Sequence, residues 1–237
     1  MSITESAKLL SPKNNCKKGQ RQTVYPLKRH EDIIHIANWL MEHTSKKYVL
    51  AFVLGINIGL RANELLSLRM NQLFWQDGSV RAIPDIEDTA DGIEILQSKT
   101  GKYRTIFLNA ECKVALEWYF PIRGMCLYTD DYLFSSREGG NIHVDTFRKV
   151  LKQAAKACGI KQNIGTHTCR KTWGWHQYKY NCDTANLDIT MLQRAFGHSS
   201  PEVTLRYLGI TDEEDKALYH SMVIKVITDS NFYGGIC

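Results

Sequence analysis

A histidine and a tyrosine stand nine positions apart in the stretch GHSSPEVTLRYLGI, residues 197–210. Ser200 is a residue type that caps helix N-termini and Pro201 suits the first helical position, so the sequence predicts a short helix that carries Tyr207 two turns from its start. The imidazole of His198 can exchange a proton with a reacting group, and a phenol can act as a nucleophile. Taken alone, a tyrosine inside a helix is more often packed than reactive.

Positively charged side chains stand at three other places where a helix or hairpin is expected. Arg61 lies at a turn before a helix in GLRANEL, and Lys99 lies in the hairpin segment SKTGKYR. In GTHTCRKTWGWHQYKY, His167 and Arg170 are three positions apart and share one face of the expected helix. Each place has an ordinary alternative: a surface ion pair for Arg61, a solvated turn for Lys99 and a polar helix face for the third segment. The third segment equally suits a surface that meets phosphate groups.

The order of these residues resembles that of the tyrosine recombinases, the phage integrase family. GLRANEL resembles the family's G-L-R-x-x-E-L box, and QSKTGKYRTIFL resembles its lysine-bearing hairpin. THTCRKT is similar to the H-x-L-R-H/K-T box, and AFGHSSPEVTLRYLGI to the L-G-H-S and T-x-x-Y box. The resemblance covers about residues 30–210 and implies an α+β, mainly helical catalytic domain with a small antiparallel sheet. The site residues that it implies are Arg61, Lys99, His167, Arg170, His198 and Tyr207.

The resemblance implies a site-specific recombinase that cleaves and rejoins DNA through a 3′-phosphotyrosyl intermediate, without a metal or other cofactor. Tyr207 would attack the phosphorus, and the resulting covalent bond would conserve the energy needed for rejoining. Arg61 and Arg170 would hold the non-bridging phosphate oxygens, because a guanidinium is planar, binds two oxygens at once and stays charged.

The resemblance also implies how protons move. His167 would handle the proton of the tyrosine, whose ordinary pKa of about 10 requires help from neighbouring groups. His198 would be a further donor to the scissile phosphate. Lys99 would protonate the departing 5′-oxygen; it is assigned in preference to Lys102 because it is the first lysine of the SKTG turn.

Two positions depart from the family pattern. Cys169 replaces the usual apolar residue between the histidine and the arginine of its box, and Phe196 stands where leucine is more common. Both changes are expected to affect packing. Glu64 is expected to orient Arg61 or to cap its helix.

Composition bounds the class of protein. The 237 residues are 43% hydrophobic and 23% charged, enough for one globular core. No apolar run approaches the ~20 residues that span a bilayer, and the N-terminus does not resemble a signal peptide. The seven cysteines are odd in number and include no C-x-x-C pair, which indicates reduced thiols in a cytoplasmic protein, without a disulfide or zinc framework. The resemblance to the tyrosine recombinases implies a prokaryotic, phage or mobile-element origin.

The net charge of +5 comes from one end of the chain. Residues 1–29 hold seven Lys and Arg against one acid, whereas the remaining residues hold 23 basic and 24 acidic groups. This indicates a flexible basic arm that could contact phosphates, and a merely solvated tail is equally consistent with the composition.

Periodicity and end signals predict the elements. Helices are expected from residue 31 onward, at 46–57, after Gly59, and in the segment ECKVALEWYF. A further helix is expected from Asp145, as its N-cap, to Gly159, as its C′ residue. Later helices are expected at 167–180, 188–196 and 201–208. Strands are expected in SVRAIP, GIEIL and YRTIFL, the last two joined by a turn at Gly101.

We expect three regions: the basic arm at 1–29, the catalytic domain at 30–215, and a helix or tail at 216–237 that docks on a neighbouring subunit. The expected partner is double-stranded DNA at a specific site, bound by a homotetramer on synapsed DNA, with a monomer or weak oligomer in its absence. Only about 30 residues precede the catalytic pattern, so the chain is either a naturally short recombinase or a fragment that lacks a DNA-clamping domain.

Two alternative functions remain open from the sequence. A type IB topoisomerase-like enzyme would use similar chemistry, although the compact boxes favour a recombinase. A non-catalytic DNA-binding regulator would also fit the scaffold, but it would have no need of all six residues. The sequence does not distinguish integration, excision and inversion.

Overall fold

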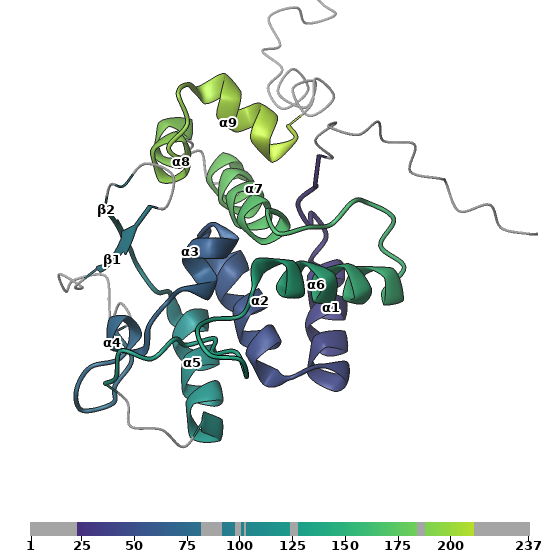
Figure 1. Ribbon diagram of the computed structural model, residues 1–237. Coiled ribbons are helices and arrows are strands. Elements are labelled where there is room, and N and C mark those ends of the chain that lie inside the picture. Colours follow the sequence, from purple (N-terminus) through teal and green to yellow (C-terminus); the bar gives the residue numbers. More distant parts are fainter. Residues whose placement is uncertain are drawn as a thin grey trace, which may run out of the picture.

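The computed structural model describes residues 23–81, 92–97, 101, 103–123, 128–183 and 188–210. In this part of the chain the structure is mainly helical with one small sheet, as predicted (Figure 1). None of the helices described is both long and apolar enough to cross a bilayer. The elements are α1 (His30–His43), α2 (Lys46–Ile58), α3 (Ala62–Leu66), α4 (Met70–Leu73), β1 (Ile93–Leu96), β2 (Tyr103–Ile106), α5 (Ala110–Arg123), α6 (Val144–Ala157), α7 (Thr168–Asp183), α8 (Ile189–Phe196) and α9 (Pro201–Leu208).

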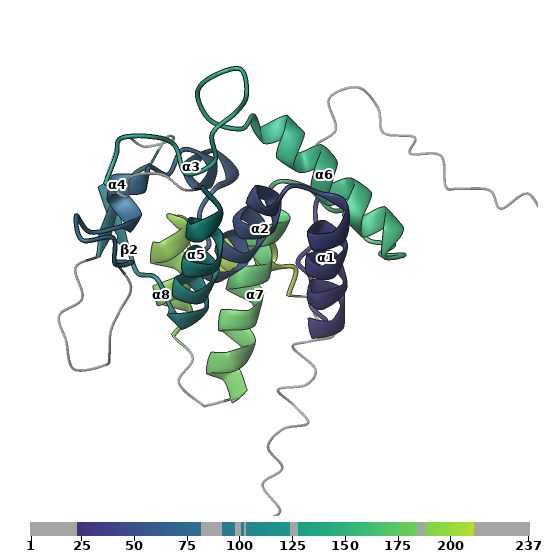
Figure 2. The same cartoon turned by 90° about the horizontal axis from the view of Figure 1, so that it is seen from below.

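Helix α2 is the centre of the main core. Its sequence is apolar almost all round, and Leu50, Phe52 and Leu54 are buried. It packs against α1, α5 and α7, which surround it in Figure 2. The helix ends at Gly59, whose φ of 62° lies in the left-handed region. Because Gly59 has no side chain, the end of α2 can lie directly against Trp173 of α7, where a Cβ would collide with the indole ring.

Strands β1 and β2 form the predicted antiparallel hairpin. Ile93 pairs with Ile106 and Leu96 with Tyr103, and Gly101 has a φ of 65° at the turn. In the segment SVRAIP, which was also predicted as a strand, Val80 forms an isolated bridge with Phe74. Residues 82–91, which include the end of this segment, lie outside the described part. Both hairpin lysines, Lys99 and Lys102, also lie outside it.

The C-terminal end of α6 was predicted correctly, but its N-terminal end was not. Gly159 follows the helix with a φ of 70°, as predicted for a C′ residue. The predicted N-cap, Asp145, was wrong: His143 is the N-cap, and its Nδ1 accepts a hydrogen bond of 3.2 Å from the backbone N–H of Asp145. Asp145 instead lies in the first turn and pairs with Arg148 at 2.8 Å.

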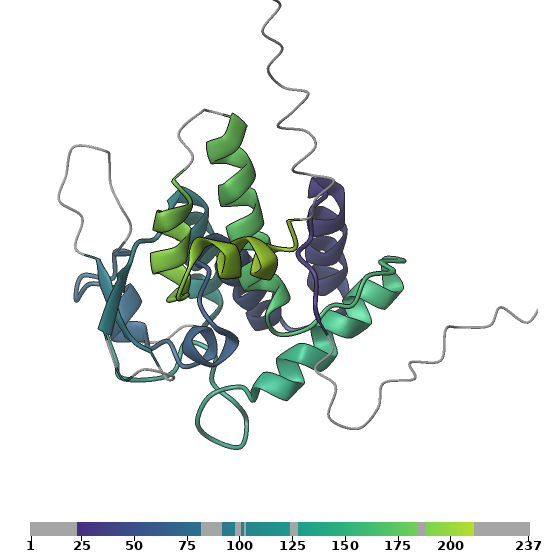
Figure 3. The ribbon, with the colours of Figure 1, turned by 90° about the horizontal axis from the view of Figure 1, so that it is seen from above.

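Helices α7, α8 and α9 enclose a second, smaller core of Leu192, Phe196 and Leu208. Figure 3 shows α9 lying across α7 beside α8. Gly174 in α7 permits this contact, because a Cβ there would lie 2.3 Å from the Phe196 ring. The predicted cap of α9 is confirmed, since the Ser200 hydroxyl accepts from the Val203 backbone N–H at 3.4 Å.

Part of the predicted flexible arm is held against the domain. Leu27 is completely buried, and its backbone N–H donates to the Thr172 hydroxyl at 2.9 Å. Gln162 donates to the Pro26 carbonyl at 3.0 Å. Residues 23–29 therefore pack on α7 and the loop before it, whereas residues 1–22 lie outside the described part. A single buried leucine and a few backbone bonds give this segment a structure that its polar composition did not indicate.

Replacing Leu27 with alanine is expected to lower the free energy of unfolding by about 2–4 kcal/mol, because it leaves a cavity in the core. Urea unfolding of the full chain measures this change. Tyr25→Ala is the matched control, since Tyr25 is 47% exposed, and its effect is expected to stay within about 0.5 kcal/mol. Equal, small effects of the two changes would show that residues 23–29 are not held.

Candidate active site

Five of the six predicted site residues come together where the end of α2, the start of α7 and the turn between α8 and α9 meet. Their elements are far apart in the sequence. The packing of α7 against α2 and of α8 and α9 against α7 brings them to one place. The sixth residue, Lys99, lies outside the described residues.

Arg170 is the most deeply buried of the five, with 3% of its surface exposed. One guanidinium nitrogen, Nη1, donates to the Gly59 carbonyl at 2.6 Å, and Nη2 donates to the Phe196 carbonyl at 3.1 Å. These carbonyls lie at the C-terminal ends of α2 and α8, where the helix dipole favours a cation. Burial lowers the pKa of Arg170 to about 10, so the group remains charged at neutral pH. The guanidinium is thereby fixed in one orientation.

Arg61 lies at the rim of the same site, at the start of α3. Its Nη1 donates to Glu64 Oε1 at 2.7 Å, and its backbone N–H donates to Glu64 Oε2 at 3.0 Å. This confirms the expected orienting role of Glu64, which is almost completely buried, whereas the Arg61 side chain is 20% exposed. The Phe196 carbonyl is also within 3.5 Å of Arg61 Nη2. Both arginines therefore point to the C-terminal end of α8.

Tyr207 joins the site from α9. Its hydroxyl lies 3.4 Å from Nδ1 of His167. Its ring packs against those of Phe196 and His198, and the Lys171 ammonium lies 4.7 Å from the centre of the Tyr207 ring. The Tyr207 ring is thus held by aromatic contacts with Phe196 and His198 and lies near the Lys171 ammonium.

His198 is positioned by its neighbours on both faces. Its Nδ1 lies 3.1 Å from the Thr204 hydroxyl in α9, and its ring stacks on that of Phe196. The same ring meets Tyr207 edge to face, with 5.0 Å between centroids. The capped start of α9 therefore sets the distance between the histidine and the tyrosine.

Burial and neighbouring charges set the resting protonation states of Tyr207 and His167. Burial raises the pKa of Tyr207, and the charge and hydrogen bonding of Arg170 oppose this rise. Burial lowers the pKa of His167, and the charges of Arg170, Lys171 and Arg61 lower it further. At neutral pH the phenol is protonated and the imidazole is neutral, so the imidazole can accept the phenolic proton.

One residue of this site was missed by the sequence analysis. Arg104 in β2 donates from Nη1 to the Ala195 carbonyl in α8, and its Nη2 lies 3.8 Å from Glu64 Oε2. A signal did exist: Arg104 has the same strand parity as the buried Ile106, so the alternation of β2 directs it inward. The hairpin therefore supplies a third guanidinium.

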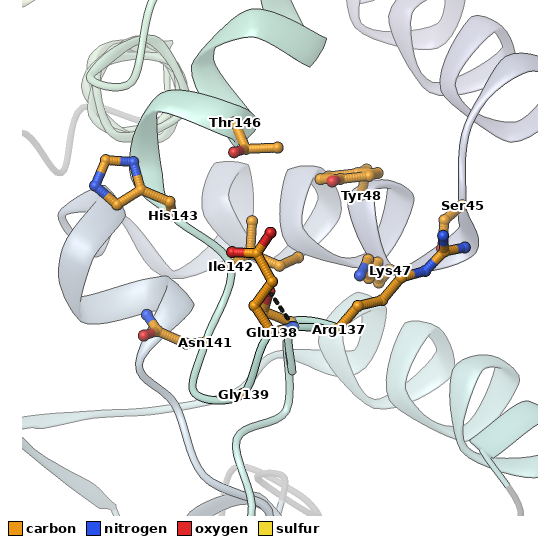
Figure 4. A pocket seen from close by; sticks show the side chains of 11 residues that line it. Ser45, Lys47, Tyr48, Arg137, Glu138, Gly139, Asn141, Ile142, His143 and Thr146 are labelled. Atoms are coloured by element: carbon orange, nitrogen blue, oxygen red, sulfur yellow. Dashed lines mark hydrogen bonds between the residues drawn. The ribbon is translucent and has the colours of Figure 1, made fainter.

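A separate cavity of about 620 Å³ lies at the N-terminal ends of α2 and α6 (Figure 4). Lys47 and Tyr48 of α2 line one side, His143 and Thr146 line another, and Arg137 comes from the loop before α6. None of the six predicted site residues lines this cavity. The candidate active site is therefore distinct from this cavity.

Comparison with known proteins shows the family of the chain. The model of the phage integrase family matches residues 18–214. The probable integrase/recombinase YoeC of Bacillus subtilis is 32% identical over 197 residues, which are 83% of this chain and 95% of YoeC. The tyrosine recombinase XerD of Listeria innocua is 28% identical over 165 residues, 68% of this chain. The chain spans 49% of that XerD, so it matches about half of this longer relative.

Solved structures share the fold. The XerA recombinase superposes with a TM-score of 0.61 at 20% identity, covering 87% of this chain and 66% of XerA. The XerH site-specific recombinase bound to its difH substrate, in a pre-cleavage complex, has a TM-score of 0.58 at 17% identity, covering 84% of this chain and 55% of XerH. At these identities the likeness establishes the arrangement of the helices and the hairpin.

Proposed function

Because the chain belongs to the phage integrase family of tyrosine recombinases, we propose that it cleaves and rejoins DNA at specific sites through a 3′-phosphotyrosyl bond to Tyr207. One observation carries this proposal: the Tyr207 hydroxyl lies 3.4 Å from His167, in a cluster where two arginines converge on the Phe196 carbonyl. A nucleophile, a proton acceptor and a cationic clamp for one phosphate thus lie together, and the family's reaction requires no metal or other cofactor.

In the proposed step, the Tyr207 oxygen attacks the scissile phosphorus as its proton passes to Nδ1 of His167. The new oxygen–phosphorus bond replaces the bond to the 5′-oxygen, which leaves and takes a proton from Lys99. Arg61 and Arg170 neutralise the charge that builds on the non-bridging oxygens. Attack by a 5′-hydroxyl of another strand reverses the sequence and restores the DNA backbone.

His198 is proposed to donate a hydrogen bond to the same phosphate. The Thr204 hydroxyl, 3.1 Å from Nδ1, favours one orientation of the ring. In this proposal Nε2, the ring nitrogen away from the Thr204 hydroxyl, is the donor to the phosphate.

The proposed partner is double-stranded DNA, bound by four copies of the chain on two synapsed sites. The XerH and Tn1549 integrase structures, which share this fold, contain DNA. We further propose that residues 1–22 contact phosphates through their basic side chains and that residues 216–237 dock on a neighbouring subunit.

The decisive test traps the intermediate. A pool of nicked duplexes with randomised flanks is incubated with the full chain, so that cleavage releases a short strand and prevents rejoining. Covalent adducts are isolated in denaturing detergent, and their DNA is sequenced to identify the preferred site. Adducts enriched for one sequence support the proposal, whereas the absence of adducts would favour a non-catalytic regulator. Relaxation of supercoiled DNA without strand exchange would favour the topoisomerase alternative.

A titration of the free protein tests the proton acceptor. The His167 imidazole is expected to titrate below the ordinary histidine pKa of 6.5, because burial and three neighbouring cations disfavour its charged form. Histidine side-chain NMR of the full chain measures the midpoint. Lys171→Gln is expected to raise it, since one of the cations is removed. A His167 midpoint at or above 6.5 would contradict the proposed neutral acceptor.

A further inference from the structure

Arg104 is a charged residue on the buried face of a hairpin. Its register partner in β1 is the buried Ile95, and Ile106, two positions later, is also buried. The Arg104 side chain is only 14% exposed. Burial lowers the pKa of its guanidinium, and the charge of Glu64 opposes this effect. An arginine at such a position costs more than an apolar residue unless its charge is used.

The hydrogen bonding of Arg104 is incomplete. Nη1 donates to the Ala195 carbonyl. Within the part of the chain that is described, nothing accepts a hydrogen bond from Nε or Nη2, although both nitrogens are buried. The Glu64 carboxylate oxygen closest to Nη2 is 3.8 Å away, beyond hydrogen-bond distance. Arg104 therefore forms an ion pair with Glu64 but donates no hydrogen bond to it.

Glu64 is at present committed to Arg61. Both carboxylate oxygens accept from Arg61, one from the guanidinium at 2.7 Å and one from the backbone N–H at 3.0 Å. If the Arg61 guanidinium turns to a phosphate, Glu64 loses its strongest partner. Its carboxylate is only 1% exposed, so water cannot replace that partner. An unpaired buried carboxylate would oppose the movement of Arg61.

We propose that Arg104 is a positioning residue that takes over Glu64 when Arg61 engages the scissile phosphate. This inference rests on the proposed function. Arg104 does not touch the DNA: it closes the 3.8 Å gap to Glu64 and keeps the buried carboxylate paired. Its bond to the Ala195 carbonyl also ties β2 to the end of α8, where the neighbouring Phe196 carbonyl contacts both Arg61 and Arg170.

The first test is single-turnover adduct formation by Arg104→Gln. The rate is expected to fall about 10²-fold, as for loss of one preorganised group in an active site. The affinity for duplex DNA is expected to change less than about threefold, because most phosphate contacts lie elsewhere. Arg69→Gln is the matched control: this arginine pairs with Asp130 outside the site, and its loss is expected to leave cleavage unchanged.

The second test separates this role from a direct phosphate contact. In the Arg104→Gln background, Glu64→Gln removes the unpaired charge while keeping one oxygen that accepts from Arg61. The double variant is therefore expected to cleave about tenfold faster than Arg104→Gln alone, a coupling expected for residues that share a network. A double variant that is no faster than Arg104→Gln would overturn the proposal, because loss of a direct phosphate contact is not repaired at Glu64.

The remaining outcomes distinguish failure of the role of Arg104 from failure of the proposed function. Wild-type cleavage by Arg104→Gln would overturn the role of Arg104 while leaving the proposed function intact, whereas absence of adducts with the wild-type chain would remove the proposed function itself. If Arg104→Gln does not fold, Arg104→Lys replaces it. A single ammonium cannot reach both the Ala195 carbonyl and Glu64, so this variant is expected to cleave about tenfold more slowly. Wild-type cleavage by Arg104→Lys would overturn the proposal.

Discussion

Replacing Tyr207 with phenylalanine is expected to abolish the covalent protein–DNA adduct while leaving the fold and DNA binding intact. The change removes the hydroxyl that lies 3.4 Å from His167 and keeps the ring that packs on Phe196 and His198. Without the nucleophilic oxygen, no other step can form the phosphotyrosyl bond. The loss of rate is expected to reach about 10⁴-fold or more, as for removal of other enzymes' nucleophiles.

Adduct formation on the nicked duplex, separated in denaturing detergent, measures this loss. Tyr180→Phe is the matched control, because this tyrosine lies on α7 with 68% of its surface exposed. It is expected to form adducts at the wild-type rate. Persistent adducts with Tyr207→Phe would show that a different residue attacks the phosphorus.

Replacing Arg170 with glutamine is expected to slow adduct formation about 10²–10³-fold, because one fixed donor to the phosphate is lost. The same change leaves the carbonyls of Gly59 and Phe196 without the guanidinium that they bind. The free energy of unfolding is therefore also expected to fall, by about 1–3 kcal/mol. Single-turnover cleavage and urea unfolding of the same preparation measure the two effects.

Arg170→Lys separates charge from geometry. A lysine keeps the positive charge but cannot donate to both carbonyls and to a phosphate at once. It is expected to cleave more slowly than the wild-type chain even under conditions where it is fully folded. If the rate of either variant falls only in proportion to its unfolded fraction, Arg170 acts in folding and not in the phosphate clamp.

Local signals in the sequence predicted most elements correctly. The apolar run of α2, the alternation of β1 and β2 and the cap at Ser200 are each decided by neighbouring residues, and each is confirmed. The predicted start of α6 was wrong because His143, two residues before Asp145, caps the helix. His143 accepts the hydrogen bond from the Asp145 backbone, so the helix starts earlier than the aspartate indicated.

The candidate site residues came from the resemblance of their boxes to those of the family, and the structure brings five of them together, whereas Lys99 lies outside the described residues. The distances between these residues could not be predicted from the sequence. Arg61 and the Phe196 carbonyl are 135 positions apart, and Arg170 and the Gly59 carbonyl are 111 apart. Such pairings depend on how α2, α7 and α8 pack together.

The sequence by itself therefore determined the family, the fold class and most of the helices and strands that carry the candidate site residues. The tertiary structure alone decided that residues 23–29 are held by a buried leucine and that Arg104 joins the arginine cluster. The physical reason is the same in both cases. Periodicity records which face of a segment is apolar, but the partner of a buried polar or charged group is chosen by segments distant in the chain, and only the packed fold brings them within hydrogen-bond reach.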